Sequence, residues 1–324
     1  MKKTTSAKSF AKIILFGEHS VVYKQPAIAL PLYSVDVNVT ITPRDTGQWI
    51  ESRYYDGPID RLNGNLLGVK KLINWIVTNI GDPAVTFTLK ITSKIPSERG
   101  MGSSAATAVA ITRALYDFFE VPLSRAELLK IANIEELVTH GNPSGIDTAT
   151  VSSDNPVWFV KNQQNEQIDF NLSSDFLVVA DSGIKGKTSA AVGLIAENKI
   201  TNPDAVNPLI KQLGKIAIQA REGLRTANSG LIGKLMTESH QILCKLGVST
   251  PTLDRFVKLA INSGAYGAKL TGSGMGGCMI ALVDSSQKAQ KLATTLRNAG
   301  ATSTWIQSFK KYGYKTEVED DYIG

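Results

Sequence analysis

Two closely spaced glycines and the adjacent hydroxyl side chains of Ser103 and Ser104 occur together in the segment 96–106, Pro-Ser-Glu-Arg-Gly-Met-Gly-Ser-Ser-Ala-Ala. Glycine lets main-chain N–H groups approach an anion, and the unpaired N–H groups in the first turn of a helix add partial positive charge. An alternating apolar run at 85–91 precedes the segment and a helical apolar stripe ending at Phe118 follows it, which gives the order strand, glycine loop, helix. The pattern predicts a phosphate-binding loop. It is neither a Walker A sequence nor a G-x-G-x-x-G fingerprint, and close helix packing is the alternative explanation.

A second glycine-rich stretch, Thr-Gly-Ser-Gly-Met-Gly-Gly-Cys at 271–278, lies between strand candidates at 267–270 and 278–283. Glycine at 272, 274, 276 and 277 costs too much chain entropy for an ordinary strand interior. The stretch therefore predicts either a close approach of the backbone to a phosphate or cofactor, or a turn or bulge between paired strands.

Carboxylates flank the turn His-Gly-Asn-Pro-Ser-Gly at 140–145, where a predicted helix ends. Asp147 follows the turn, and a carboxylate in that position either caps the backbone or reaches a ligand. Glu136 shares a helical face with apolar residues, which predicts a semi-buried carboxylate that needs a cation or hydrogen bonds. The periodicity does not exclude Glu135 for the same place.

Lys12 interrupts an apolar strand predicted at 11–16. A lysine is unfavourable there unless its ammonium group reaches a carboxylate, a phosphate or, by snorkelling, the surface water. Glu18 and His19 directly follow Gly17 at the end of this strand, where ligand contacts are common.

The elements that must position these residues change in character along the chain. Strands are predicted at 27–32, 35–41, 157–160 and 176–179, and helices at 66–77, 188–198, 205–225, 231–246 and 252–263. Ser124-Arg-Ala-Glu127 is a capping box that opens a further helix running to about 139. Because helices dominate after about residue 185, we expect a domain boundary near 175–185, with domains at 1–180 and 181–324.

Composition excludes several classes of protein. The chain of 324 residues carries a net charge of +6, but its lysines are scattered and no run of five basic residues suggests a nucleic-acid surface. Two cysteines and three histidines do not provide a disulfide framework or zinc spacing, which is typical of a cytoplasmic protein. No apolar stretch is long enough for a transmembrane span, so we expect a protein without a membrane partner.

The four clusters together resemble the motifs of the galactokinase, homoserine kinase, mevalonate kinase and phosphomevalonate kinase (GHMP) superfamily, and most closely those of its mevalonate kinases. Gly-Glu-His-Ser-Val-Val-Tyr at 17–23 resembles the first motif, Gly-Met-Gly-Ser-Ser-Ala-Ala at 100–106 the second, and 271–278 the third. The segment 140–147 is similar to the one that carries the catalytic aspartate. The similarity covers nearly the whole chain and keeps the order of the motifs.

This resemblance implies an α+β fold of two domains, the first like domain 2 of ribosomal protein S5 and the second ferredoxin-like, with ATP and substrate between them. Asp147 would orient the substrate hydroxyl and accept its proton late, because a carboxylate beside Lys12 is a weak base and positioning contributes most. Ser104 and Glu136 would hold Mg²⁺, which prefers oxygen ligands. The residues implied to hold the ATP phosphates are Glu98, Arg99, Gly100, Met101, Gly102, Ser103 and Ser104. Further implied contacts are Ser93 with the nucleotide and Glu18, His19 and Thr188 with the substrate, with Lys187 beside them.

The resemblance also implies the reaction. Ser-Val-Val at 20–22 replaces the acidic sequence that galactokinases use for sugar hydroxyls, whereas homoserine kinases lack the residue matching Asp147 and the diphosphate decarboxylases lack the one matching Lys12. We expect ATP-dependent phosphorylation of the primary hydroxyl of mevalonate for isoprenoid synthesis, with no nucleic-acid partner and with a homodimer left open. The alternatives are another kinase of the superfamily, such as a phosphomevalonate kinase or a mevalonate kinase of different regiochemistry, and a non-catalytic RNA-binding protein on the same fold.

One departure from the family pattern concerns the phosphate loop. Ser97-Glu98-Arg99 stands where small or glycine residues are usual. A Glu98 carboxylate beside phosphates is repulsive unless it points away or meets Arg99.

Overall fold

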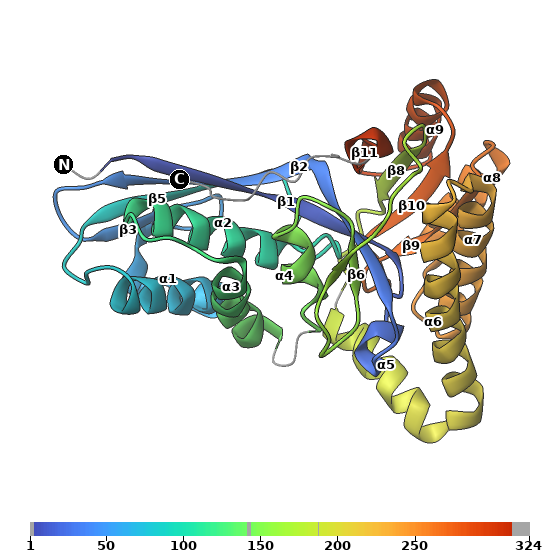
Figure 1. Ribbon diagram of the computed structural model, residues 1–324, viewed down its shortest axis with the longest axis horizontal. Coiled ribbons are helices and arrows are strands. Elements are labelled where there is room, and N and C mark those ends of the chain that lie inside the picture. The colour runs from blue at the N-terminus through green and yellow to red at the C-terminus, as the bar shows by residue number, and fades with distance from the viewer. Residues whose placement is uncertain (1–2, 141–143, 187, 313–324) are drawn as a thin grey trace.

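A computed structural model describes residues 3–140, 144–186 and 188–312. Two sheets organise this part of the chain, and the helices pack against them to form two lobes (Figure 1). One lobe contains the first half of the chain and the other the second half, and α5 (Thr188–Thr201) starts near the place where they meet.

The first sheet is built around a long antiparallel pair, β1 (Thr5–Phe16) and β2 (Ala27–Pro43). On its other edge β2 pairs with β5 along one half and with β6 along the other, and β3 joins β5 in parallel. The remaining strands are β3 (Gln48–Glu51), β4 (Asp56–Pro58), β5 (Phe87–Ser93), β6 (Val157–Phe159) and β7 (Glu166–Gln167).

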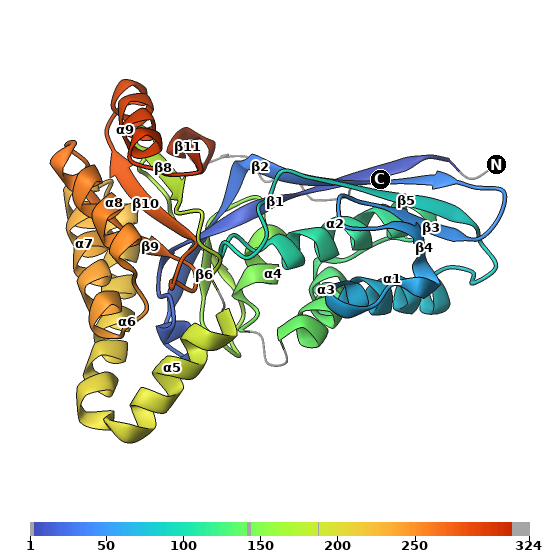
Figure 2. The same ribbon diagram turned by 180° about the vertical axis from the view of Figure 1, so that it is seen from behind.

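Four helices cover one face of this sheet, as both views show (Figures 1 and 2). They are α1 (Leu67–Asn79), α2 (Ser103–Phe118), α3 (Arg125–His140) and α4 (Ile146–Val151). The central helix α2 carries Ala, Val, Ile and Leu on its inner face and is buried over most of its length, which makes it the core of the lobe. At the start of α3, Ser124 and Glu127 exchange backbone-to-side-chain hydrogen bonds of 3.2 and 3.3 Å, which confirms the predicted capping box.

The second sheet has the order β11-β8-β10-β9, with all neighbours antiparallel. Its strands are β8 (Phe176–Asp181), β9 (Gly267–Thr271), β10 (Cys278–Val283) and β11 (Ser303–Ser308). Its helices are α5, α6 (Pro203–Arg225), α7 (Ser229–Lys245), α8 (Pro251–Asn262) and α9 (Ser286–Asn298). The βαββαβ succession with this strand order is the ferredoxin-like arrangement, and the α+β fold of two domains is confirmed.

The observed elements correct several predicted boundaries. The strands expected at 27–32 and 35–41 are one strand, because a register shift opposite Phe10 and Ala11 places a bulge at 33–35 that interrupts the alternation. The strand expected at 85–91 begins only at Phe87, since Val85 closes a turn on Asp82. The predicted division at 180 falls inside β8, and all of β8 belongs to the second sheet, so we propose a domain boundary between β7 and β8.

No helix in the described ranges is both long and apolar enough to cross a membrane.

Candidate active site

The loop between β5 and α2 turns by means of positive φ angles. Gly100 and Gly102 have φ of 72° and 70°, and Gly102 caps α2 without a side-chain hydrogen bond. The N–H of Ala106 is bonded to the carbonyl of Gly102 in the first turn of the helix. The N–H groups that precede Ala106 therefore lie at the positive end of a helix dipole, as the sequence pattern predicts for a phosphate loop.

The second glycine-rich stretch, 271–278, packs its backbone against the backbone of this loop. It is the connection between the antiparallel strands β9 and β10, and its backbone touches the phosphate loop: a Cβ on Gly272 would lie 2.9 Å from the carbonyl oxygen of Gly100. A Cβ on Gly277 would lie 2.8 Å from the carbonyl oxygen of Arg99. The stretch is thus both a turn and a close backbone approach, and the group it approaches is the phosphate loop itself.

The acidic and basic residues of the loop are paired across the two domains. Arg99 lies 2.9 Å from the Asp181 carboxylate, and Glu98 lies 2.7 Å from the ammonium group of Lys185. The Glu98 carboxylate therefore meets Lys185 rather than Arg99, and its φ of 57° turns the chain at this point. A backbone hydrogen bond joins the same two segments, because the N–H of Gly186 donates to the carbonyl oxygen of Glu98 at 2.9 Å.

Lys12 and Asp147 form an ion pair of 2.9 Å beside the start of α2. Lys12 is almost completely buried, whereas Asp147, in the first turn of α4, is 31% exposed. The Lys12 stem passes directly over Gly102, where an added Cβ would lie 2.9 Å from its Cγ, and the Lys12 N–H donates to the Met101 carbonyl at 3.0 Å. The pair predicted from sequence is therefore present, and its carboxylate is partly exposed to solvent next to the phosphate loop.

Oxygen atoms gather at the start of α2 on the side of α3. The Ser104 hydroxyl donates to Glu136 at 2.6 Å, and Glu135 is also buried, with Thr139 donating to its Oε1 at 2.7 Å. The other oxygen of Glu135, Oε2, is buried without a hydrogen-bond partner among the described residues. Burial, reinforced by the neighbouring Glu136 carboxylate, raises the pKa of Glu135 to about 7. Both glutamates that the periodicity left open thus contribute to the cluster.

Glu18 and His19 are buried between the domains. Glu18 forms an ion pair with Lys269 of β9, and both side chains are fully buried. His19 Nε2 lies 2.9 Å from the carbonyl oxygen of Ser273, and burial lowers the pKa of His19 to about 4. The ring is therefore neutral near pH 7 and donates from Nε2 to that carbonyl. Lys269 was not singled out in the sequence, although it interrupts an apolar strand as Lys12 does.

Two expected site residues, Ser93 and Thr188, lie at the margin of this cluster. Ser93 ends β5 and accepts a hydrogen bond from the Ile95 N–H at 3.2 Å, at the entrance to the phosphate loop. Thr188 is exposed at the start of α5. Lys187 and the residues 141–143 of the aspartate motif lie outside the described residues.

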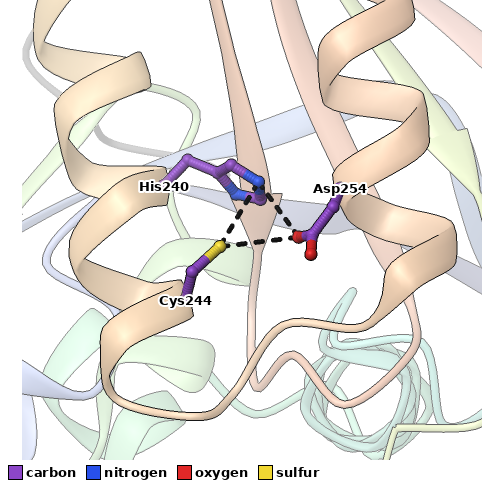
Figure 3. Close-up of side chains that lie close together, drawn as sticks. All are labelled: His240, Cys244 and Asp254. Atoms are coloured by element: carbon purple, nitrogen blue, oxygen red, sulfur yellow. Dashed lines mark hydrogen bonds and ion pairs between the residues drawn. The ribbon is translucent and has the colours of Figure 1, made fainter.

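A further polar cluster joins α7 and α8, as Figure 3 shows for His240, Cys244 and Asp254. His240 Nε2 lies 3.3 Å from Asp254 and 3.7 Å from the Cys244 sulfur. Its Nδ1 accepts the Leu270 N–H at 3.3 Å, which places the ring proton on Nε2. Burial raises the pKa of the Cys244 thiol to about 11. A metal ion would have to displace the proton on His240 Nε2 and the proton of the Cys244 thiol. We therefore interpret the cluster as a hydrogen-bonded support for β9.

Comparison with known proteins agrees with this geometry. The family model for the N-terminal domain of GHMP kinases matches residues 69–154, and the model for the C-terminal domain matches residues 220–302. A mevalonate kinase of Pyrococcus abyssi is 33% identical, covering 98% of this chain and 99% of the relative, and one of Methanocaldococcus jannaschii is 33% identical over 87% and 93%.

The fold is similar to that of solved kinases as well. A structure of the mevalonate kinase of L. major in complex with R-mevalonate superposes with a TM-score of 0.81 at 26% identity, over 94% of this chain and 95% of that one. Sequence, fold and the arrangement of the motifs lead to the same assignment. This chain belongs to the mevalonate kinases of the GHMP kinase family.

Proposed function

We propose that this enzyme transfers the γ-phosphoryl group of ATP to the primary hydroxyl of mevalonate and so serves isoprenoid synthesis. Its relatives are mevalonate kinases, and a related structure contains R-mevalonate. The single observation that carries the proposal is the Lys12–Asp147 pair, which lies against Gly102 at the start of α2. A carboxylate oxygen that can orient an alcohol is there next to a helix terminus that can hold phosphates.

The backbone at 98–104 is proposed to hold the ATP phosphates, with Ser93 as a further nucleotide contact. Main-chain N–H groups of the loop and of the first turn of α2 provide the donors. The loop between β9 and β10 packs against this backbone and fixes its path. Arg99 is engaged by Asp181, so its side chain supports the loop and only its backbone remains for the nucleotide.

Ser104 and Glu136 are proposed to hold Mg²⁺, with Glu135 as an additional oxygen. The residues present fit this ion, because a hydroxyl and two buried carboxylates supply hard oxygen ligands and one Glu135 oxygen lacks a hydrogen-bond partner among the residues described. When bound, Mg²⁺ would neutralise negative charge on the ATP phosphates. Burial of the Glu135 carboxylate without a cation is unfavourable, and the neighbouring Glu136 adds to the penalty, so the pKa of Glu135 is raised.

Asp147 is proposed to position the reacting hydroxyl and to accept its proton as the bond to phosphorus forms. Its partner Lys12 holds the carboxylate in place and offsets charge on the transferred group. His19 and Thr188 are proposed to contact the substrate, whereas the Glu18 carboxylate is already engaged by Lys269.

A coupled assay of ADP release tests the proposed function. Purified enzyme is compared with mevalonate, phosphomevalonate, homoserine and galactose as acceptors, at fixed MgATP. We expect turnover with mevalonate far above the other acceptors. Preference for phosphomevalonate would show that the enzyme is a phosphomevalonate kinase instead. RNA binding with steep salt dependence and no ADP release would show that the protein is the non-catalytic alternative.

A further inference from the structure

The C-terminal end of α4 is held by side chains from three other elements. Ser9 of β1 donates from its buried hydroxyl to the Val151 carbonyl at 2.9 Å. Arg113 of α2 and Arg125 of α3 both donate to the Ser152 carbonyl, at 3.1 and 3.3 Å. We call these three donors, Ser9, Arg113 and Arg125, the α4 cap. The last carbonyls of a helix have no partner within the helix, so the α4 cap satisfies groups that would otherwise need water.

Two members of the α4 cap tie the helix to the strand that carries Lys12. Arg113 also donates to the Lys8 carbonyl of β1 at 3.2 Å, so its guanidinium group bridges β1 and α4. The Ser9 hydroxyl is a second direct link between the two elements. At the other end of α4, in its first turn, Asp147 meets Lys12 at 2.9 Å. Strand and helix are therefore joined by polar contacts at both ends of α4.

Apolar packing alone would leave the position of α4 along β1 loosely defined. The helix lies against β1 (Figures 1 and 2), and Ile146 and Ala149 are buried in a small apolar cluster that includes Ile14 of this strand. Apolar contacts are non-directional, whereas hydrogen bonds weaken steeply away from their preferred geometry. Because α4 has only six residues, a shift of its C-terminal end is carried to Asp147, about one turn away.

We propose that the α4 cap positions the carboxylate that orients the reacting hydroxyl: it fixes the C-terminal end of α4 against β1 and so sets the place of Asp147 beside Lys12. Its members are positioning residues, because their hydrogen bonds go to main-chain carbonyl oxygens and not to Asp147. The inference rests on the proposed function of the Lys12–Asp147 pair.

Substitution of Arg113, in the parent and in Asp147→Asn, tests this role. Arg113→Met keeps much of the length of the side chain but removes the hydrogen bonds to β1 and to the end of α4. Its kcat with mevalonate should fall by at least about tenfold, while the KM for MgATP changes less than about threefold, because the phosphate loop keeps its own contacts. In the Asp147→Asn background the same substitution should lower kcat less than about threefold further, since the carboxylate that the α4 cap positions is already gone.

Ser9→Ala is a milder second variant. It removes one hydrogen bond to α4 with little change in side-chain volume. We expect kcat to fall at least about fourfold in the parent and less than about twofold in Asp147→Asn. If Arg113→Met does not fold, this comparison decides the question.

Arg255→Met is the matched control, because it removes the same kind of contact from a helix that carries none of the proposed site residues. Arg255 donates to the Ala299 carbonyl at 2.8 Å, at the C-terminal end of α9 in the second domain. This variant should keep kcat within about twofold of the parent, whatever its effect on Tm. A purely structural role of the α4 cap predicts instead that its variants lower kcat by the same factor in the parent and in Asp147→Asn, through a smaller fraction of folded enzyme.

Three outcomes would overturn the proposal. They are parental kcat in a folded Arg113→Met and in Ser9→Ala, equal losses of kcat in the two backgrounds, and a loss in Arg255→Met as large as that in Arg113→Met. The parent and Asp147→Asn are assayed first. No turnover of mevalonate by the parent, or parental turnover by Asp147→Asn, would overturn the proposed function of the ion pair together with this inference. Normal turnover by the parent and slow turnover by Asp147→Asn, followed by one of the three outcomes, overturns this inference alone.

Discussion

Replacement of Glu135 by glutamine shows whether the oxygen cluster at the start of α2 is built for a cation. The pKa of Glu135 is about 7 in the folded enzyme, against an ordinary value of 4.5, because the carboxyl group is buried next to another carboxylate. The folded state binds the proton more tightly, so stability falls as pH rises through the window from 4.5 to about 7. The penalty is less than about 1 kcal/mol at pH 5 and reaches about 3 kcal/mol at pH 8.

Urea unfolding at pH 5 and pH 8 measures this difference. Glu135→Gln should be more stable than the parent by up to about 3 kcal/mol at pH 8, and nearly equal to it at pH 5. Mg²⁺ should raise the Tm of the parent more at pH 8 than at pH 5, and should raise that of the variant less, since the cation replaces the missing partner of the carboxylate.

An exposed glutamate in a helix serves as the control for the loss of charge. Glu197→Gln in α5 should change the unfolding free energy equally at the two pH values. If the parent and Glu135→Gln show the same pH dependence of stability, the buried carboxylate does not carry the predicted penalty and the reasoning fails.

Four further predictions concern the site. Asp147→Asn and Lys12→Met should each lower kcat by roughly 10² or more with little change in nucleotide affinity. The losses in the double variant should be much less than additive, because the pair acts as a unit. In steady-state kinetics, an Asp147→Asn variant within a fewfold of the parent would contradict this. Ser104→Ala should raise the Mg²⁺ concentration needed for half-maximal rate without lowering Tm, and an unchanged rate at limiting Mg²⁺ would count against the metal assignment. Gly102→Ala places a Cβ 2.9 Å from Lys12 Cγ at a φ of 70°, so stability should fall by about 1–3 kcal/mol and kcat should fall with it; parental values in both denaturation and turnover would refute the packing. Burial lowers the pKa of His19 to about 4, so the stability that the neutral ring contributes is lost as pH falls from 6.5 toward 4. His19→Gln should therefore reduce the difference in unfolding free energy between pH 7 and pH 4. Urea denaturation at the two pH values measures that difference, and an unchanged difference would exclude the effect.

The local motifs were predictable because their signals lie within short segments. The Ser124–Glu127 capping box, the glycine loop before α2 and the hairpin between β9 and β10 each depend on backbone conformations that neighbouring residues dictate. The apolar strand around Lys12 indicated only that its ammonium group needs an anion or surface water. The resemblance to the kinase family implied Asp147 as its neighbour, and the structure pairs the two.

The partners of the remaining charges were not predictable from one sequence. Lys269 gives the same signal as Lys12, but its partner Glu18 comes from the other domain, 251 positions away. Glu98 pairs with Lys185 for a similar reason, since the loop after β8 reaches the phosphate loop only once the domains are packed. The choice between Glu135 and Glu136 could not be made from helical periodicity, because both side chains are buried at the junction of α2 and α3.

The product formed from mevalonate and ATP tests the central claim most directly. ³¹P NMR of the reaction mixture identifies the carbon that carries the new phosphate. The proposed function predicts a phosphorus signal split by the two protons of the primary carbon, together with ADP in equal amount. A signal without that splitting, as expected for phosphorylation of the tertiary hydroxyl, or ADP without any phosphorylated mevalonate, would contradict it.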